Sequence, residues 1–449
     1  MELNNNFYHI LESRHSEVTG SCNILTTHFP DNSEKSIMID YGMFQEPKYV
    51  ELNFNMEHNI SKLIGVVLTH NHLDHVGKVA CLPQQGYDRK IYTTYETKIQ
   101  METSFSFKNS KSFYRKGLMP YCSREDIINT MEMVEACKYN KVIKIDENFS
   151  IMLLGNSHML GAAMILVLVS YPGYVPYSFL FTGDYKEKNI LFKSPRIPSW
   201  VKKLKNLIII SESTYGIEEK ENSKDDTIEK IISSLNEGKI ALINSIAGRF
   251  PQILYELKLA QDSGLLSTKY KICIDSKIGI KQLINHINIL GNFFLPENLH
   301  FISKISRKEL LEDDSPKIIL ASSTGTSPLY MERAVNNPKW IIYFTNHIAP
   351  ESKAYNLVNS KEYTNVFWTG KYSGHGRFQE FVRLFSKFNI TGLFANHGTF
   401  QNKRDFINEM SNLFDLEFAE ELDNSKKYKI NDSGIIQIIS GIEQQKIAI

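Results

Sequence analysis

Apolar residues along the first 210 or so positions occur in short runs that Gly, Asn and Asp interrupt. Runs of this length with turn residues between them predict a strand-rich domain with some helices. After the apolar run Asn206–Ile210 the apolar positions take a helical spacing. In the segment from Asp225 to Glu237, the residues that fall on one helical face are Ile228, Ile231, Ile232 and Leu235.

Predicted strands and helices then alternate. The strands are Ile240–Ile243, Tyr270–Ile274, Lys317–Ala321 and Trp340–Phe344, and the helices between the first three are Gln252–Leu259 and Ile278–Ile289. This alternation predicts a parallel sheet with helices on both faces. From about Thr391 short strands return, at Gly392–Ala395 and Gly434–Ile439. We therefore expect a strand-rich domain that is interrupted by an inserted α/β domain and completed by the end of the chain.

Composition agrees with this organisation and narrows the class of protein. The chain has 449 residues, 42% of them hydrophobic and 22% charged, as in ordinary globular proteins of two domains. The net charge of +1 gives no overall attraction to nucleic acid, so a polyanion-binding surface has to be local. Five cysteines without a C-x-x-C pair predict reduced thiols and a cytoplasmic protein. The longest apolar run, Ala162–Val169, is too short to span a membrane, and the first residues lack a secretory signal, so no membrane association is expected.

The densest group of candidate metal ligands is Thr69–Gly77, which contains His70, His72, Asp74 and His75. It follows the apolar run Leu63–Leu68, which predicts a buried strand, so the pattern H-x-H-x-D-H falls on a strand-to-helix loop. Alternate residues of an extended loop point the same way, so the first two histidines can bind one ion while the Asp and the third His turn toward a second. Imidazole and carboxylate without thiolate suit a catalytic zinc site. The alternative, a solvated histidine-rich turn, needs no such spacing after a buried strand.

This motif resembles the signature of the metallo-beta-lactamase fold superfamily, and the resemblance implies further ligands downstream. The His expected after a later strand is His158, in Gly155–Ala163. The Asp expected in a glycine turn after the next strand is Asp184, in Phe179–Tyr185. The Asp expected at an early strand end is Asp40.

Three more positions resemble the beta-CASP branch of that superfamily, whose inserted domain caps the zinc site and whose members cut nucleic acids. They are Glu212 before Ser-Thr-Tyr-Gly, His375 in Ser-Gly-His-Gly, and His397 in Asn-His-Gly. The resemblance covers roughly residues 35 to 400 and implies the α/β class: an αββα sandwich with an inserted parallel α/β cap. We expect the first part of the sandwich at 1–212, the cap at 213–388 and the closing part at 389–449.

The resemblance also implies a mechanism with two zinc ions, with manganese as the alternative metal. One ion takes His70, His72 and His158, the other takes Asp74, His75 and His397, and Asp184 bridges both. A hydroxide held between two metals attacks the phosphodiester. Asp40 orients a ligand or the nucleophile, and Glu212 holds His375 protonated as the general acid.

His397 favours RNA over DNA, because His at this motif is associated with the RNA-cutting members of the branch. The members that it resembles are the messenger-RNA 3′-end processing nuclease and ribonuclease J. Phosphate contacts are expected from a loop that opens a helix and from one nearby cation, namely Ser322, Ser323, Gly325, Thr326 and Arg249. A second candidate surface is Phe105–Lys116, where cations are interleaved with aromatic residues; the alternative, which the pattern favours, is a solvated helix face with a packed aromatic side. The chain departs from the branch at Gly376–Arg377, where many relatives have Asp, and at Thr399, where many have Glu.

Single-stranded RNA is thus the expected substrate, and protein partners or a homodimer are expected as further interactions. The alternatives are a DNA-acting nuclease of the same branch, a metallo-hydrolase of a non-nucleic-acid ester, thioester or lactam, and a silent subunit. The cap motifs argue against the small-ester enzyme, and the complete ligand set argues against the silent subunit. The sequence leaves open whether cleavage is internal or proceeds from the 5′ end.

Overall fold

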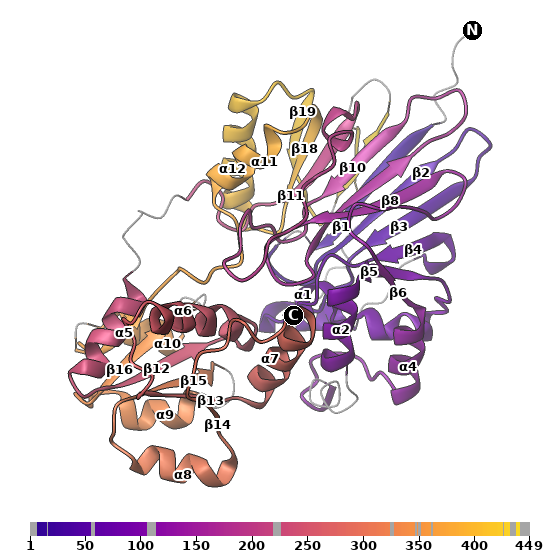
Figure 1. Ribbon diagram of the computed structural model, residues 1–449. Helices are drawn as coiled ribbons and strands as arrows, with labels where there is room; N and C mark the ends of the chain where they lie inside the picture. The colour runs from indigo at the N-terminus through magenta and orange to yellow at the C-terminus, as the bar shows by residue number, and fades with distance from the viewer. Residues whose placement is uncertain are drawn as a thin grey trace. The chain divides into compact units, whose positions relative to one another are not determined.

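The computed structural model describes residues 7–15, 17–54, 59–105, 114–218, 226–323, 327–345, 348, 352–360, 362–424, 426–431 and 437–440. The chain divides into two compact units. The first unit is Met1–Glu219 together with Gly374–Ile449, and the second is Lys220–Ser373. The second unit is thus an insertion in the first, as the sequence predicts (Figure 1).

Two sheets form the first unit. In the described part of the chain the first sheet has the order β21-β20-β1-β2-β3-β4-β5-β6. Its strands are β1 Tyr8–His15, β2 Cys22–His28, β3 Glu34–Ile39, β4 Leu63–Val67, β5 Ile91–Thr94, β6 Val134–Cys137, β20 Lys426–Ile430 and β21 Gln437–Ser440. The strands from β3 to β6 run parallel, so the carboxyl ends of β3 and β4 lie at the same edge.

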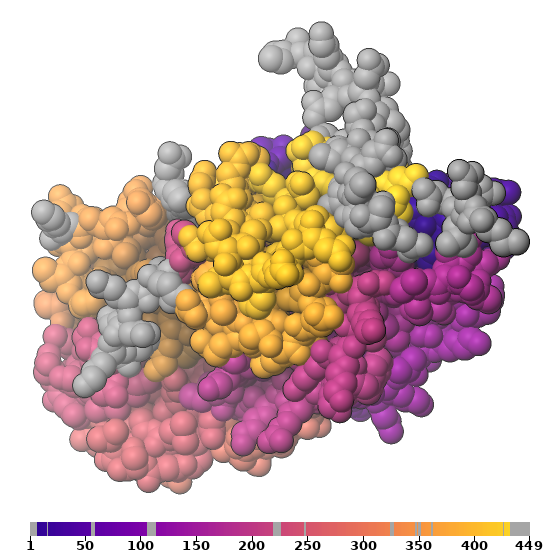
Figure 2. All heavy atoms as spheres, turned by 90° about the horizontal axis from the view of Figure 1, so that it is seen from above, coloured from indigo at the N-terminus to yellow at the C-terminus, as the bar shows by residue number. Residues whose placement is uncertain are grey.

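The second sheet has the order β19-β18-β11-β10-β9-β8-β7 among the described residues. Its strands are β7 Val142–Lys144, β8 Phe149–Gly155, β9 Ala163–Val169, β10 Tyr177–Phe181, β11 Leu207–Glu212, β18 Ile390–Asn396 and β19 Phe418–Glu421. Strands β10, β11 and β18 are parallel neighbours, although β18 comes after the insertion, and their register pairs Glu212 with Asn396. The closing segment therefore completes this sheet, and Figure 2 shows it in yellow beside the magenta residues of the same unit.

The sheets pack face to face and helices cover their outer faces. Alternate side chains such as Leu25 and Ile37 of the first sheet and Ile165 and Phe179 of the second meet in one buried core between the sheets. The helices are α1 Leu73–Val76, α2 Tyr95–Ser104 and α4 Arg124–Met133 on the first sheet, and α11 Phe378–Phe385 and α12 Phe400–Leu413 on the second. The first unit is thus an αββα sandwich, the predicted fold class.

The second unit is a parallel sheet of order β14-β13-β15-β12-β16-β17 within the described residues. Its strands are β12 Ile240–Ser245, β13 Lys271–Asp275, β14 Leu299–Phe301, β15 Lys317–Ser322, β16 Trp340–Phe344 and β17 Val366–Trp368. Its helices are α5 Thr227–Asn236, α6 Phe250–Asp262, α7 Lys277–Leu290, α8 Lys304–Glu312, α9 Ser327–Ala334 and α10 Lys353–Asn359. The four apolar residues predicted on one face of α5 are all buried, which confirms the helical spacing.

The boundaries of the units differ from those expected. They fall after Glu219 and after Ser373, rather than after residues 212 and 388. The second boundary lies earlier because Phe378, Phe381 and Phe385 of α11 are buried in the core of the first unit. Of the helices that the structure describes, none is long and apolar enough to cross a membrane.

Candidate active site

Apart from His375, which lies shortly before α11, the predicted site residues of the first unit stand at or just beyond the ends of strands. Asp40 follows β3, the H-x-H-x-D-H motif follows β4, and Asp184 follows β10. Glu212 ends β11 and His397 follows β18. The parallel pairing of β3 with β4 and of β10 with β11 and β18 brings these ends together at one edge of the sandwich.

The predicted ligands form two clusters that share one carboxylate. His70, His72, His158 and Asp184 offer ligand atoms within 4.8 Å of one another, and so do Asp74, His75, Asp184 and His397. A third group on the same criterion is Asp184, Glu212, His375 and His397. Asp184 belongs to all of them, which agrees with the bridging position that the sequence predicts.

The spacing of the ligand atoms is compatible with an ion bound between them. In the first cluster Nδ1 of His72 lies 3.0 Å from Nε2 of His70 and 3.1 Å from Nε2 of His158. Oδ2 of Asp184 lies 3.5 Å and 3.6 Å from the same two Nε2 atoms. In tetrahedral zinc sites with Zn–N near 2.0–2.1 Å, neighbouring ligand atoms are about 3.3 Å apart. The dimensions of the first cluster therefore fit a divalent metal ion.

Four of the histidines use Nδ1 for a hydrogen bond within the protein. The partners are the Thr69 hydroxyl for His70 (2.9 Å), Asp40 Oδ2 for His75 (2.7 Å), the Gly374 carbonyl for His158 (2.8 Å) and the Thr214 hydroxyl for His397 (3.0 Å). Where Nδ1–H donates, Nε2 keeps its lone pair, and it is Nε2 of each ring that faces the clusters. The surrounding protein thus fixes the tautomer that binds a metal.

Among the described residues, three buried polar atoms of the second cluster have no hydrogen-bond partner. They are Nε2 of His75, Nε2 of His397 and Oδ1 of Asp184. The carboxylate oxygen lies 3.2 Å from His75 and 3.5 Å from His397. Buried polar atoms without partners are rare, and three that converge on one point fit a cation between them.

The electrostatics of the two clusters favour a positively charged group between the ligands. Burial alone would lower the pKa of His75, but the carboxylates of Asp184 and Asp40 raise it well above its usual value. Burial would raise the pKa of Asp184, but His397, His75 and His375 hold it well below the usual range, so it is a carboxylate. Burial and the neighbouring His75 lower the pKa of His70, which leaves that imidazole neutral. The donor set therefore suits divalent metal ions, which supply the positive charge without a proton.

The backbone at the site is held in uncommon conformations. Asp40 and His397 have φ of 63° and 48°, in the left-handed region that costs a non-glycine residue free energy. Asp40 is fixed there because its carboxylate accepts from the Thr69 amide (2.8 Å), the Thr69 hydroxyl (2.8 Å) and His75. Gly183, with φ of 55°, carries Asp184 so close to the histidine loop that a Cβ would lie 2.8 Å from Cβ of Thr69.

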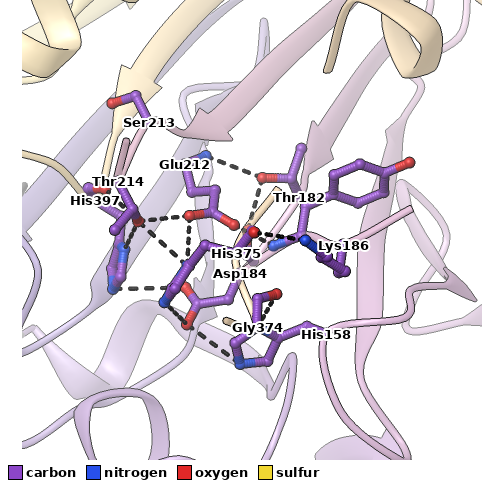
Figure 3. A network of polar contacts seen from close by, with 12 residues as sticks. His158, Thr182, Asp184, Lys186, Glu212, Ser213, Thr214, Gly374, His375 and His397 are labelled. Atoms are coloured by element: carbon purple, nitrogen blue, oxygen red, sulfur yellow. Dashed lines mark hydrogen bonds and ion pairs between the residues drawn. The ribbon is translucent and has the colours of Figure 1, made fainter. Parts of the chain in front are cut away.

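Beside the clusters lies the predicted pair of Glu212 and His375 (Figure 3). Oε2 of Glu212 is 2.7 Å from Nδ1 of His375, and Nε2 of His375 is 3.9 Å from Oδ2 of Asp184. The Glu212 side chain is 1% exposed and that of His375 is 20% exposed. A buried carboxylate that binds the imidazole from behind leaves Nε2 at the accessible edge of the clusters.

The sequence motifs do not single out three residues that organise this site. The Thr214 hydroxyl donates to Glu212 Oε2 (2.5 Å) and accepts from His397 Nδ1 (3.0 Å), so it links the pair of Glu212 and His375, the acid pair, to the second cluster. Asn156 donates to the carbonyl oxygen of Asp184 (2.6 Å) and accepts from the amide of His158 (3.0 Å). The ammonium of Lys186 donates to the carbonyl oxygen of His375 (3.2 Å). The only signal for them in the sequence is that they lie within two residues of a predicted site residue.

The predicted substrate contacts lie in the second unit. Ser322 ends β15, Ser323 donates its amide to Ser245 (3.0 Å), and Arg249 is 5% exposed at the start of α6. Gly325 and Thr326 lie outside the described residues, as do residues 106–113 of the predicted aromatic and cationic surface. The contacts of these residues with substrate stay predictions.

Comparison with known proteins finds a matching family model and several relatives. Residues 20–193 match the family model of the metallo-beta-lactamase superfamily. Transcription termination factor FttA of Lokiarchaeum sp. is 25% identical over 383 residues, which are 79% of this chain and 58% of that protein. Endoribonuclease ysh1 of Schizosaccharomyces pombe is 23% identical, over 77% of this chain and 46% of that protein. RNase aCSPSF2 of Saccharolobus solfataricus is 23% identical, over 75% of this chain and 68% of that protein.

Among solved structures, the metallo-beta-lactamase fold protein YhfI from Bacillus subtilis matches with a TM-score of 0.29 and 14% identity, over 70% of this chain and 97% of that one.

These sequence matches, with the αββα sandwich and its ligand clusters, confirm the predicted resemblance. The chain resembles the beta-CASP branch of the metallo-beta-lactamase superfamily over most of its length, and its second unit is an inserted α/β domain. It spans only part of the length of the curated relatives: 58% of FttA, 68% of RNase aCSPSF2 and 32% of an Integrator complex subunit 11 homolog of Dictyostelium discoideum.

Proposed function

We propose that this chain is a zinc-dependent ribonuclease that hydrolyses phosphodiester bonds of single-stranded RNA. The observation that carries the proposal is the pair of metal-ligand clusters that share Asp184, with Glu212 and His375 beside them. Two of the relatives support the choice of RNA, because they are named an endoribonuclease and an RNase.

In this proposal His70, His72, His158 and Asp184 hold one zinc ion, and Asp74, His75, His397 and Asp184 hold the other. When bound, such a metal pair supplies Lewis-acid charge for the phosphate and lowers the pKa of the attacking water. Asp40, Thr69, Thr214 and the Gly374 carbonyl keep the imidazoles in the tautomer and orientation that binding needs.

His375 then acts as the general acid. Glu212 accepts the hydrogen bond from Nδ1 and stabilises the charged imidazolium, so that Nε2–H can protonate the leaving oxygen of the cleaved ester. The buried carboxylate cannot rotate away, because it also accepts from the amide of Tyr185 and from the Thr214 hydroxyl. A positioned acid is what an alkoxide leaving group requires, since alkoxides are strong bases.

The test is cleavage of matched single strands. RNA and DNA of one sequence, labelled at the 5′ or the 3′ end, are incubated with protein plus zinc or manganese, and the products are sized on a gel. Asp184→Asn protein is the control for a contaminating nuclease. Faster cleavage of RNA than of DNA supports the proposal. The product sizes obtained with the 5′ label and with the 3′ label distinguish internal cleavage from cleavage at the 5′ end. Equal or faster cutting of DNA assigns the chain to DNA, and hydrolysis of small esters or lactams alone removes nucleic acid from the proposal.

A further inference from the structure

Arg377 is the cation that lies beside the acid pair. Its guanidinium stacks on the ring of Tyr215, with Cζ 4.2 Å from the ring centroid. The same ring meets the imidazole of His375 edge to face, with centroids 5.9 Å apart and an angle of 87°. The tyrosine ring thus contacts both a guanidinium and the proposed general acid, and all three residues belong to the first unit.

The backbone on both sides of Arg377 is fixed. The amide of Gly376 donates to the carbonyl of Tyr185 (2.6 Å), and the amide of Arg377 donates to Oε2 of Glu380 (2.8 Å). A Cβ at Gly376 would lie 3.1 Å from both the Phe381 ring and the Tyr185 carbonyl oxygen, so the chain passes close to its neighbours there. The position of Arg377 relative to His375 is therefore set by the fold.

The charge of this guanidinium is not balanced within the described residues. No carboxylate among them lies within 4.0 Å of it, and Nη1 is buried without a hydrogen-bond partner. Glu380, the nearest acidic residue in the sequence, instead accepts from the Arg377 amide and pairs with Lys186 at 3.3 Å. An unpaired donor of a charged group beside a hydrolytic centre fits an anionic ligand.

The geometry points to a phosphate of the substrate strand as that ligand. We propose that Arg377, backed by Tyr215, binds the backbone phosphate next to the scissile one and so places the leaving group under His375. This inference rests on the proposed ribonuclease function. A planar guanidinium presents two parallel N–H donors that match a phosphate, and stacking on an aromatic ring leaves that edge free. The chain's net charge of +1 leaves such a local contact to supply the attraction.

A matched arginine lies on the same unit. Arg404 stacks on Phe400 with Cζ 4.2 Å from the ring centroid, but it pairs with Glu421 at 3.3 Å. Arg404→Gln therefore removes an equally stacked guanidinium that has a carboxylate partner. Any effect shared by Arg377→Gln and Arg404→Gln comes from charge or packing in general, and an effect confined to Arg377→Gln comes from its site.

The experiment measures binding and turnover separately. Binding of a fluorescent single-stranded RNA is followed by anisotropy at several salt concentrations, in a His375→Ala background that cleaves the RNA too slowly to affect the measurement. We expect Arg377→Gln to weaken binding about tenfold and to reduce the slope of log Kd against log salt by about 0.7, the value of one phosphate contact on a single strand. Arg377→Lys keeps the slope but binds more weakly, and Arg404→Gln matches its parent. With His375 intact, Arg377→Gln raises KM more than it lowers kcat.

Metal content and melting temperature are measured for each variant. If Arg377→Gln fails to fold, Arg377→Met, which keeps an apolar chain on the Tyr215 ring, takes its place. An unchanged slope and Kd in the uncharged variant overturns the assignment of Arg377, provided that the parent binds and the wild type cuts RNA. If the wild-type protein neither binds nor cuts RNA, the ribonuclease function itself is wrong.

Discussion

Nδ1 of His375 lies 2.7 Å from Oε2 of Glu212, although the two residues are on opposite sides of the inserted unit in the sequence. The parallel pairing of β11 with β18 joins the ends of the interrupted domain, and the return of the chain at Gly374 brings His375 to the end of β11. The carboxylate is buried and held by the Tyr185 amide and the Thr214 hydroxyl. The imidazole is therefore positioned by the protein before any substrate binds.

The first prediction separates proton transfer from metal binding. His375→Ala should lower the rate of RNA cleavage roughly 10²–10⁴-fold, the usual contribution of a positioned general acid. Its metal content should stay at the wild-type level, because five other histidines and two aspartates make up the two predicted ligand sets. Single-turnover cleavage and metal analysis on the same preparation provide the check. Cleavage at the wild-type rate would show that another group protonates the leaving oxygen.

The second prediction concerns the number of metals. Purified protein should contain close to two zinc equivalents, since the described residues form two ligand clusters around Asp184. Asp184→Ala should lose occupancy at both positions as well as activity, because its two oxygens face different clusters. Elemental analysis of wild type and variant decides this. Protein that is free of metal and takes up none on reconstitution would contradict a dinuclear site.

A third prediction concerns Thr214, which links Glu212 to His397. Thr214→Val removes both hydrogen bonds at nearly constant volume. We expect a loss of about 10–100-fold in metal affinity, as is usual for residues that orient metal-binding imidazoles. Thr214→Ser retains the hydroxyl and should bind metal almost as tightly as wild type. Competition with a chromophoric chelator measures the affinity, and equal affinities of the Val and Ser variants would argue against this role.

The fourth prediction concerns the stability of the second unit. The Lys317 side chain is 0% exposed, and its ammonium lies 3.0 Å from Oδ2 of Asp313. Burial would raise the pKa of Asp313, but hydrogen bonds from Ser315 and Lys317 lower it to about 2. Because the folded pKa is below the usual aspartate pKa of 3.8, this carboxylate stabilises the fold above that pH, and the contribution is lost as the pH falls through about 2.

Asp313→Asn should therefore lower the melting temperature of the protein at neutral pH, and the difference from wild type should shrink as the pH falls toward 2. Asp314→Asn is the control, because Asp314 pairs at 3.0 Å with Lys339 and both side chains are about half exposed. Thermal melts across the pH range test this. A difference between Asp313→Asn and wild type that does not vary with pH would contradict the role of the carboxylate.

The sequence by itself determined the metal-binding chemistry and the order of the elements. The identity of the ligands is local information, because three histidines and an aspartate lie within the six residues of the H-x-H-x-D-H loop after β4. The pattern of apolar residues likewise predicts α5, β12 and β13. An amphipathic helix such as α5 buries one face at helical spacing, and central strands such as β12 and β13 are buried on both faces, which gives a continuous apolar run.

Only the tertiary structure decided which polar atoms meet. The hydrogen bond of His158 to the Gly374 carbonyl joins residues that are 216 positions apart. The position of Thr214 between Glu212 and His397, and the stacking of Arg377 on Tyr215, depend on how two sheets and the returning chain pack. The second boundary of the insertion and the place of α11 were likewise set by packing, since the buried phenylalanines of α11 pack against the outer face of the second sheet. Such contacts are long-range and depend on side-chain geometry, which a one-dimensional pattern of residue types does not contain.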